Sequence, residues 1–476
     1  MVSKSFIEVD KVRQRVESLT NDTYGQKFIN LTIDRLNLPK DTVSHYIRFK
    51  VSNYYNMREQ RFDKDLSIYR LVSASVKYLG FLIMTFLYSS TKTDKNKKHN
   101  FTLLIDDIQS SNEIERWIPL EKEFKDGNTV FISRADIDNE ESRNLFYRPF
   151  LKGYSREMIK SKYIKLALLD LPKVIYYSLK LNFNLLFIYT HLINDYMYFY
   201  SLFKTCTADY LIQDRNLGTT NPIKNYLFKE SGGLITSCLQ KNIIQHNGTG
   251  LFYDIDIFFT FGNKTGEEAL KLGGNVGKIH PVGSLSMNNA LKSYEEKSEF
   301  LYDVLYVGLN TESKRTDWDG YYRSIAWLAK LADENSNLKI AIKHHATWRG
   351  DNREQDLIRN SKVFHVDASE NSYISGLKSK IVLTYGSSML YEFMAFKKNI
   401  YFLDPGLENP FINNFVYSDN IVLESYDKLK MLVQNNRIHF DATVEDANDY
   451  CHPNADISKS ISNILKLESL GENNIV

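Results

Sequence analysis

Short apolar runs alternate with longer amphipathic segments along the second half of the chain. The runs are rich in β-branched and aromatic residues and are found at residues 303–308, 339–343, 363–366, 381–384, 400–403 and 421–422. Runs of this kind are typical of buried strands, and apolar residues at helical spacing between them are typical of helices that pack on a sheet. Because strands alternate with helices, the pattern predicts a parallel sheet in this half.

The first half of the chain repeats this alternation and contains more helix. Residues 1–70 have a polar, helical pattern that is interrupted at Pro39. The pattern then predicts strands at residues 100–106, 129–133, 210–212, 255–261 and 279–284, and helices at 155–204, 221–230 and 265–272. A segment rich in lysine and glutamate, residues 289–297, separates this series from the second one.

The two series together predict the fold class. We expect an α/β protein with two Rossmann-like domains facing a cleft, because each series is a set of βα units and one linker joins them. The expected boundaries are residues 1–285 for the first domain, 286–301 for the linker and 302–476 for the second domain.

Charge and cysteine content exclude several classes of function. The formal net charge is +2, so the chain has no basic excess that would indicate a nucleic acid as partner. Cys206, Cys238 and Cys451 are widely separated, which argues against a zinc site and favours a reducing compartment. The first residues lack the apolar core of a secretion signal, so we expect a cytoplasmic protein.

Two apolar stretches raise the question of membrane contact. Residues 78–88 are too few to span a bilayer, which takes about 20 residues, and residues 181–203 contain several polar side chains. Both stretches are expected to be buried helices. A peripheral membrane contact of the first stretch stays open as an alternative, because Lys92, Lys95, Lys97 and Lys98 follow it.

Candidate chemistry is concentrated around a turn in the second domain. Gly386, Ser387 and Ser388 lie between a predicted strand and a predicted helix, where backbone N–H groups and hydroxyls are suited to bind a phosphate. Glu392 follows one turn later and is placed to bind a ribose diol. The alternative is an ordinary capped βα unit without a ligand.

Three motifs in order resemble those of bacterial capsule and surface-polysaccharide transferases, including the β-Kdo transferases and the polyglycerophosphate transferases. The chain has Gln245-His246-Asn247-Gly248, then Lys343-His344-His345-Ala346, then Gly386-Ser387-Ser388 with Glu392. The resemblance covers about residues 205–425. Two positions depart from the family pattern: Asn247 separates the expected His-Gly pair, and Ala346 stands where a proline is expected.

The resemblance implies a GT-B glycosyltransferase that needs neither a metal nor a cofactor. Its donor would be a nucleotide-activated sugar, such as Kdo or another acidic sugar on a CMP-linked donor. The acceptor would be a surface polysaccharide or a lipid-linked chain at the inner face of the cytoplasmic membrane. A polyol-phosphate transferase of the same fold, a sugar-nucleotide epimerase and a non-catalytic polysaccharide-assembly protein remain alternatives.

Sugar transfer leaves negative charge on the departing nucleotide phosphate, and a metal-free site must stabilise that charge. The candidate groups for the phosphate are His246, Lys343, Arg315 and one of the pair His344 and His345. Strand alternation predicts that the two adjacent histidines point to opposite sides, so one of them is expected to be structural.

The reaction also needs a carboxylate to attack the sugar carbon or to activate the acceptor hydroxyl. Asp214 follows a predicted strand and is the preferred candidate, paired with His246 as the second catalytic residue. Asp209, Asp106 and Asp107 are competitors. The alternative for each aspartate is a structural carboxylate at a strand end.

Overall fold

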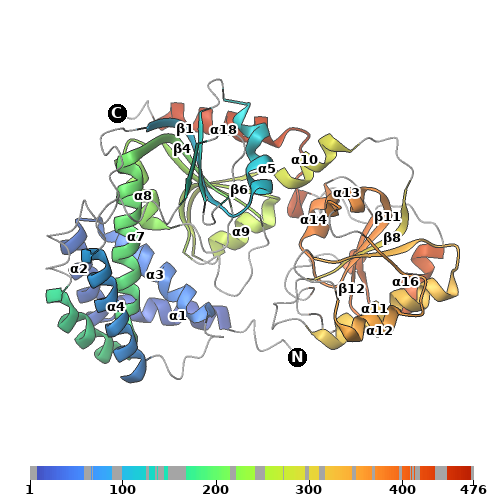
Figure 1. Ribbon diagram of the computed structural model, residues 1–476, viewed down its shortest axis with the longest axis horizontal. Helices are drawn as coiled ribbons and strands as arrows, with labels where there is room; N and C mark the ends of the chain where they lie inside the picture. The colour runs from blue at the N-terminus through green and yellow to red at the C-terminus, as the bar shows by residue number, and fades with distance from the viewer. Residues whose placement is uncertain are drawn as a thin grey trace. The chain divides into compact units, whose positions relative to one another are not determined.

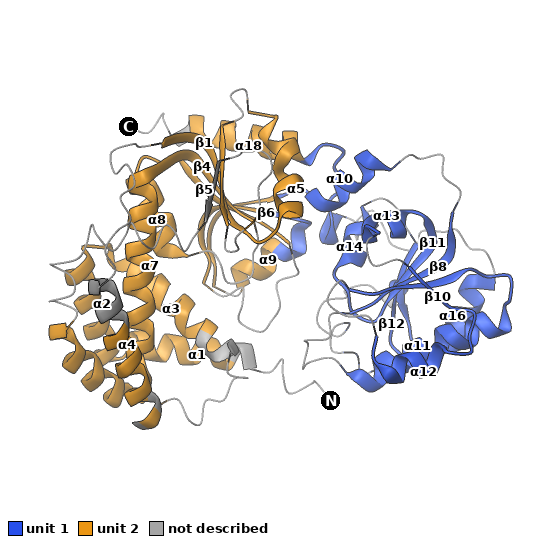
Figure 2. Ribbon diagram, in the orientation of Figure 1, with its two compact units in different colours: residues 1–5, 260–265, 281–457 blue, residues 6–259, 266–280, 458–476 orange. Residues whose placement is uncertain are grey.

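The chain is described by a computed structural model, shown in Figure 1. It describes residues 8–57, 66, 68–87, 99–124, 128–133, 137, 144–147, 168–214, 221–241, 252–271, 273–294, 300–309, 317–345, 350–366, 370–395, 399–407, 409, 412, 419–434 and 448–472. The chain divides into two compact units (Figure 2). The N-terminal unit comprises residues 6–259, 266–280 and 458–476, and the C-terminal unit comprises residues 260–265 and 281–457.

A seven-stranded sheet forms the centre of the N-terminal unit, in the order β3-β2-β1-β4-β5-β6-β7. The strands are β1 (His99–Ile108), β2 (Thr129–Ser133), β3 (Asn144–Tyr147), β4 (Cys206–Gln213), β5 (Ile235–Leu239), β6 (Asp254–Thr260) and β7 (Asn275–Pro281). The pairs from β3 through β6 are parallel. The order reverses between β1 and β4, and open α/β sheets bind ligands at the carboxyl ends of the strands at such a point.

Helices pack around this sheet, and α1 to α4 lie together on one side of it (Figure 1). They are α1 (Glu8–Asn21), α2 (Thr23–Leu36), α3 (Lys40–Met57), α4 (Ile68–Leu87), α5 (Ser111–Glu121), a helix at residues 168–181, α7 (Leu185–Thr205), α8 (Pro222–Glu230), α9 (Asn263–Lys271) and α18 (Ile457–Glu472). The predicted interruption at Pro39 is confirmed: Asn37 ends α2 in the left-handed conformation, with φ 53°, and α3 begins after the proline.

The C-terminal unit repeats the same topology with a six-stranded sheet, in the order β10-β9-β8-β11-β12-β13. Its strands are β8 (Tyr302–Val307), β9 (Ile340–Lys343), β10 (Phe364–His365), β11 (Ser379–Thr384), β12 (Asn399–Leu403) and β13 (Val422–Leu423), and every neighbouring pair is parallel. Its helices include α10 (Leu285–Ser293), α11 (Trp318–Glu334), α12 (Asn352–Ile358), α13 (Ser372–Leu377), α14 (Met389–Met394) and α16 (Tyr426–Gln434). The strand order reverses between β8 and β11.

The expected α/β protein with two Rossmann-like domains is therefore confirmed, and the cleft between them stays a prediction. The sequence pattern missed β3 and β5. In β5 all five residues are buried, including Thr236 and Ser237, so the strand has neither alternation nor an apolar run that would reveal it.

The two units do not follow the expected boundaries throughout. The last helix, α18, belongs to the N-terminal unit although the sequence places it in the segment 302–476. Contacts explain this position: the hydroxyls of Tyr210 and Ser469 are 3.1 Å apart, and Lys466 Nζ donates to Glu123 O at 2.9 Å. The expected linker at 286–301 starts as α10, where Asn288 Nδ2 donates to Ala455 O at 3.0 Å within the C-terminal unit.

Candidate functional site

Three strand ends of the C-terminal unit bring the predicted donor-binding segments to one edge of its sheet. Val307 ends β8 beside Thr384 at the end of β11, and Thr384 Oγ1 donates to Val307 O at 2.7 Å. On the other side of β8, Gly308 N donates to Lys343 O at 2.9 Å at the end of β9. This edge includes the point where the strand order reverses, so the candidate residues occupy the expected ligand-binding position.

The Gly386-Ser387-Ser388 turn is held by the residue that precedes it. Gly386 N and Ser387 N donate to Thr384 Oγ1 at 3.3 and 3.2 Å, and all three turn residues are partly exposed. Met389 N donates to Ser387 Oγ at 3.4 Å, whereas Ser388 makes no side-chain cap bond. Within this turn, Ser387 therefore makes the side-chain bond to the start of α14, and Ser388 at the N-cap position does not.

Glu392 lies in α14 with only 3% of its surface exposed. Tyr373 Oη donates to its two carboxylate oxygens at 3.1 and 3.0 Å, and Ser284 Oγ donates to Oε2. A ribose diol would have to share these oxygens with the two hydroxyls. The ribose-binding role of Glu392 stays a prediction.

The two adjacent histidines have different surroundings. The His344 ring is largely buried, stacks on the His365 ring at a centroid distance of 5.2 Å, and has Nε2 3.2 Å from Glu354 Oε1. His345 is exposed, and Lys343 before them is buried. His344 is therefore held inside the unit, and His345 is the more accessible of the pair.

Glu354 is a buried residue that sequence reasoning missed. Its carboxyl group accepts a hydrogen bond from Tyr321 Oη at 2.8 Å, and burial raises its pKa to about 7. Burial, together with His365 and Lys343, lowers the pKa of His344 to about 4. The signal in the sequence is Asp351-x-x-Glu354, which resembles a capping box. Asp351 does cap α12, but Glu354 points to Tyr321.

Buried charged residues gather where β1 and β4 end in the N-terminal unit. Asp214 N donates to Asp106 O at 3.0 Å, so the two aspartates lie at adjacent strand ends. Lys224 Nζ donates to Asp106 Oδ2 at 3.0 Å and also to Gln213 Oε1. Asp107 has φ 78° at a shift in strand register, a backbone conformation that is unusual for a residue other than glycine.

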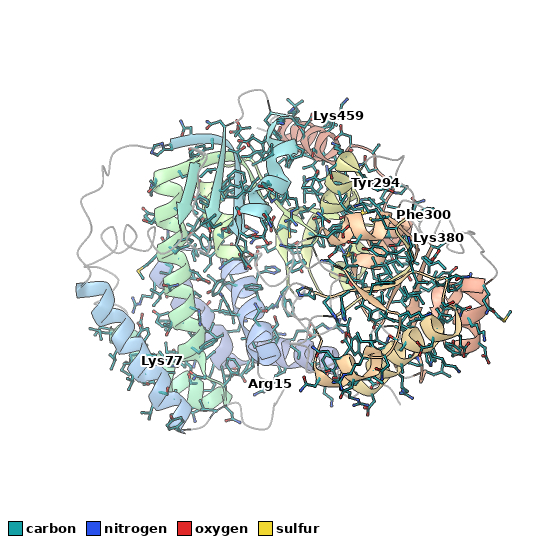
Figure 3. All side chains as sticks on the ribbon, turned by 45° about the vertical axis from the view of Figure 1, so that its right-hand side comes forward. Arg15, Lys77, Tyr294, Phe300, Lys380 and Lys459 are labelled. Atoms are coloured by element: carbon teal, nitrogen blue, oxygen red, sulfur yellow. The ribbon has the colours of Figure 1, made fainter. Side chains whose placement is uncertain are left out.

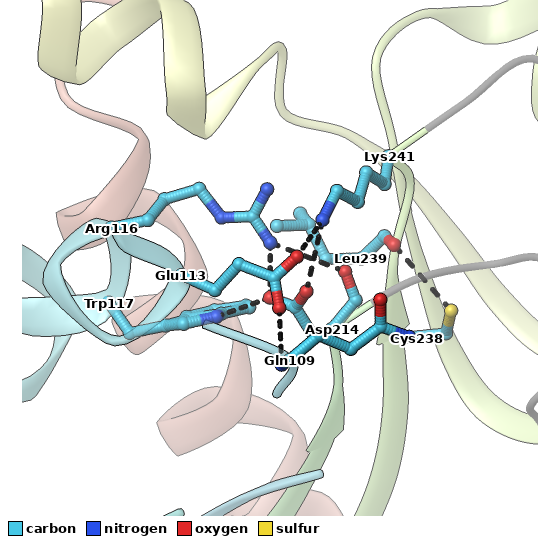
Figure 4. Close-up of polar contacts among 8 residues, drawn as sticks. All are labelled: Gln109, Glu113, Arg116, Trp117, Asp214, Cys238, Leu239 and Lys241. Carbon is cyan, nitrogen blue, oxygen red and sulfur yellow. Dashed lines mark hydrogen bonds and ion pairs between the residues drawn. The ribbon is translucent and has the colours of Figure 1, made fainter. Parts of the chain in front are cut away.

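Asp214 lies in an ion-pair network that Figure 4 shows. Its Oδ1 accepts hydrogen bonds from Trp117 Nε1 at 2.5 Å and from Arg116, both on α5. Lys241 Nζ is 3.6 Å from Oδ2 and also pairs with Glu113. The carboxylate is fully buried, so an attacking role would require access that this arrangement does not offer. Asp214 as catalytic residue stays a prediction.

The remaining candidates divide into two groups. His246 and Arg315, with the rest of the Gln245–Gly248 motif and Ala346, lie outside the described residues. The competitor Asp209 is within β4 and not at its carboxyl end, and burial raises its pKa. Among the described residues, no group of three histidine, cysteine, aspartate or glutamate side chains is placed to bind a metal ion. No helix in the described part of the chain is both long enough and apolar enough to cross a bilayer.

Comparisons with known proteins find similarity in structure but not in sequence. No protein-family model matches the chain, and no curated protein matches it. The S. aureus MnaA–UDP structure has a TM-score of 0.46 and 11% identity, covering 79% of this chain and 98% of that one. The wall teichoic acid polymerase TagF with CDPG has a TM-score of 0.47 and 11% identity, covering 86% and 99%. UDP-GlcNAc 2-epimerase from Neisseria meningitidis, bound to UDP-GlcNAc, has a TM-score of 0.45 and 13% identity, covering 78% and 100%. Similarity at this level does not assign a substrate or a reaction.

Proposed function

We propose that this chain is a glycosyltransferase that moves a sugar from a nucleotide-activated donor to a surface polysaccharide or a lipid-linked acceptor. The supporting observation is the placement of the candidate residues. Both sheets reverse their strand order next to their first strand, and in each unit one candidate follows a strand that flanks this reversal: Asp214 follows β4, and Gly386 follows β11. A Kdo or another acidic sugar on a CMP-linked donor is the proposed substrate, following the resemblance of the motifs.

The C-terminal unit is the proposed nucleotide site. The turn of Gly386, Ser387 and Ser388 would bind the phosphates through its hydroxyls and backbone N–H groups, and the N–H groups of Gly386 and Ser387 would exchange their present acceptor, Thr384 Oγ1, for a phosphate oxygen. Lys343 and His345 would add positive or hydrogen-bonding groups. Arg315 is proposed to act on the same phosphates. Glu392 would receive the ribose by exchanging one of its two hydroxyl partners, Tyr373 or Ser284.

Catalysis is proposed to need the pair Asp214 and His246 from the N-terminal unit. The position of Asp214 beside Asp106 supports a role at the sheet edge, where Arg116 and Lys241 place positive charge beside its carboxylate. No metal is proposed to take part, so transfer is expected to continue in EDTA. Complete loss on chelation, restored by magnesium, would contradict this part of the proposal.

A peripheral membrane contact is proposed for the helical side of the N-terminal unit. Tyr69, Val72 and Val76 of α4 lie at helical spacing and are 82%, 56% and 65% exposed. The helix at 168–181 likewise exposes Leu169, Tyr176 and Leu179, at 62%, 48% and 54%.

The exposed charged side chains that the structure describes on these two helices are positive. Lys77 lies on α4 (Figure 3), and Lys173 and Lys180 lie on the helix at 168–181. The one acidic residue of the second helix, Asp170, is buried and paired with Arg35 at 2.7 Å. Apolar residues flanked by lysines favour the interface of an anionic membrane, which would place the enzyme beside a lipid-linked acceptor. The fraction of the protein that sediments with phosphatidylglycerol vesicles is expected to fall when Val72 and Val76 are both changed to Asp.

The decisive experiment measures binding and turnover of CMP-, UDP-, GDP- and CDP-linked donors. Transfer to an acceptor with release of the nucleotide would support the proposal. Epimerisation of a donor without an acceptor would favour the epimerase. Release of CMP together with transfer of a polyol phosphate would favour the polyol-phosphate transferase. Absence of both turnover and nucleotide affinity would favour a non-catalytic assembly protein.

A further inference from the structure

A polar cavity with a volume of about 440 Å³ lies beside the start of α3 in the N-terminal unit. Its lining includes Asp41, Thr42 and His45 of α3, Asp254 at the start of β6, and residues 273–275. The volume is in the range of small-molecule binding sites, about 300–1,000 Å³.

The segment at residues 273–275 has already used its hydrogen-bond donors. Its three backbone N–H groups donate to carbonyl oxygens of the same unit, at distances between 2.6 and 3.0 Å. The side-chain donor Asn275 Nδ2 bonds to Asp254 Oδ1 at 2.8 Å. The atoms that this segment can still offer to a ligand are therefore oxygens, which accept hydrogen bonds.

Thr42 is a buried polar residue of the lining. Its side chain is 8% exposed, and its hydroxyl forms no side-chain hydrogen bond within the described part of the chain. His45 Nδ1 is likewise buried with no hydrogen-bond partner among the described residues. Buried polar groups are normally paired, because an unpaired one costs free energy. A ligand that bonds to the Thr42 hydroxyl in the cavity would recover part of this cost.

Two carboxylates line the same cavity. Burial raises the pKa of Asp254, Asn275 and His45 oppose this shift, and the negative charges of Asp256 and Asp41 add to it. Asp41 forms no ion pair with any residue that the structure describes. A positively charged ligand would relieve the repulsion between Asp41 and Asp254.

We propose that this cavity binds the ammonium group of a small amine. An ammonium group has three N–H donors and a positive charge, which match the Thr42 hydroxyl and the carboxylates of Asp41 and Asp254. A metal ion fits less well, because no group of three histidine, cysteine, aspartate or glutamate side chains in the described ranges is placed to bind one. An amino sugar and an aliphatic amine have this group in common.

The cavity is separate from the candidate catalytic edge of the same sheet. Asp254 is the first residue of β6, whereas Asp214 follows the last residue of β4. Strands β4, β5 and β6 are parallel, so the two aspartates lie at opposite edges of the sheet. The amine site is therefore independent of the proposed transfer reaction.

Calorimetric titration of the full-length protein at pH 7 with glucosamine and with putrescine, without any nucleotide, tests the proposal. At least one of the two amines is expected to bind. N-acetylglucosamine and butanediol lack the charged group of their counterparts and are expected to bind at least about tenfold more weakly. Binding of glucosamine alone would identify an amino sugar as the ligand, and binding of putrescine alone would identify an aliphatic amine.

Substitutions at Thr42 separate the hydroxyl from the shape of the side chain. Thr42→Val keeps the shape, removes the hydroxyl and is expected to weaken amine binding about tenfold. Thr42→Ser keeps the hydroxyl and is expected to stay within about twofold of the unchanged protein. Circular dichroism verifies that each variant is folded.

Asp41 also lies in the first turn of α3, where a negative charge is favoured without any ligand. Asp41→Asn is expected to weaken amine binding about threefold, because this carboxylate is exposed. Asp427→Asn is the matched control: Asp427 is an exposed acid in the first turn of α16 and does not line the cavity. It is expected to leave amine affinity unchanged.

Three results would each overturn the proposal: failure of both amines to bind, equal affinity for the amines and their uncharged counterparts, or unchanged affinity in folded Thr42→Val. Nucleotide binding and sugar transfer are measured separately. Failure of the transferase proposal would therefore not change this result.

Discussion

His344 Nε2 and Glu354 Oε1 are 3.2 Å apart in the C-terminal unit, and their pKa values move in opposite directions. The pKa of Glu354 rises from 4.5 to about 7, and that of His344 falls from 6.5 to about 4. Between about pH 4.5 and 6.5, the folded protein carries the proton on Glu354, whereas the unfolded chain carries it on His344.

The pair predicts a specific dependence of stability on pH. A raised carboxyl pKa stabilises the fold at low pH, and this contribution is lost as the pH rises from about 4.5 through about 7. A lowered histidine pKa has the opposite effect, so stability increases as the pH rises from about 4 to about 6.5. The two slopes cancel between about pH 4.5 and 6.5 in the unchanged protein.

Each single substitution is expected to remove one residue's effect on the pH dependence of the free energy of unfolding and to leave the other's effect measurable. In His344→Gln, the free energy of unfolding should fall as the pH rises from about 4.5 to about 7, at most by about 1.4 kcal/mol per pH unit. In Glu354→Gln, it should rise between about pH 4 and 6.5. Urea unfolding at a series of pH values measures both. Identical pH profiles for the two variants would show that the pair does not exchange a proton on unfolding.

Much of the fold could be predicted from the sequence, because the spacing of apolar residues indicates which positions are buried. The run at 129–133 is a strand with the predicted bounds in which every residue is buried, and the run at 381–384 is the buried C-terminal part of β11. The candidate residues that follow such strands could be located by the same reasoning. Partners far apart in the chain could not: Asp214 pairs with Arg116, 98 positions away, and Glu392 bonds to Ser284, 108 positions away. No local pattern encodes such contacts.

Lys224 and Asp106 form a buried ion pair whose loss should be costly. Lys224→Met leaves the Asp106 carboxylate buried without its ammonium partner, which is expected to lower the free energy of unfolding by about 3–5 kcal/mol. The double variant Lys224→Met with Asp106→Asn removes both charges and should recover part of this loss. Urea denaturation compares the unchanged protein, Lys224→Met, Asp106→Asn and the double variant. A double variant as unstable as the sum of the single variants would contradict the pairing.

Glu392 is expected to affect nucleotide binding more than Ser388 does. Ser388→Ala removes one hydroxyl and leaves the backbone donors, so it should cost about 1 kcal/mol of binding free energy. Glu392→Gln keeps an acceptor for Tyr373 and Ser284 but weakens a two-point contact with a ribose diol, and it should cost more. Calorimetry with the free nucleotide measures both. Unchanged affinity in Glu392→Gln would leave Glu392 as an acceptor for Tyr373 and Ser284 alone.

Asp214→Asn tests structure and catalysis at once. The amide oxygen can still accept from Trp117, but the charge opposite Arg116 and Lys241 is lost. Breaking a buried ion pair is expected to destabilise the fold by about 3–5 kcal/mol. If Asp214 acts in transfer, kcat should fall on the order of a thousandfold under conditions where circular dichroism shows a folded protein.

The matched control is Glu113→Gln, which breaks the outer pair with Lys241 and leaves Asp214 unchanged. Its effects on stability and transfer are expected to be small, because this pair is partly exposed. Nucleotide affinity should be unchanged in both variants, since the proposed nucleotide site belongs to the other unit. A sugar adduct on Asp214, detected by mass spectrometry with a slow acceptor, would identify a nucleophile, and its absence would fit a base. Transfer at a near-normal rate in folded Asp214→Asn would move the catalytic role to Asp106 or Asp209 and leave Asp214 as the structural partner of Arg116.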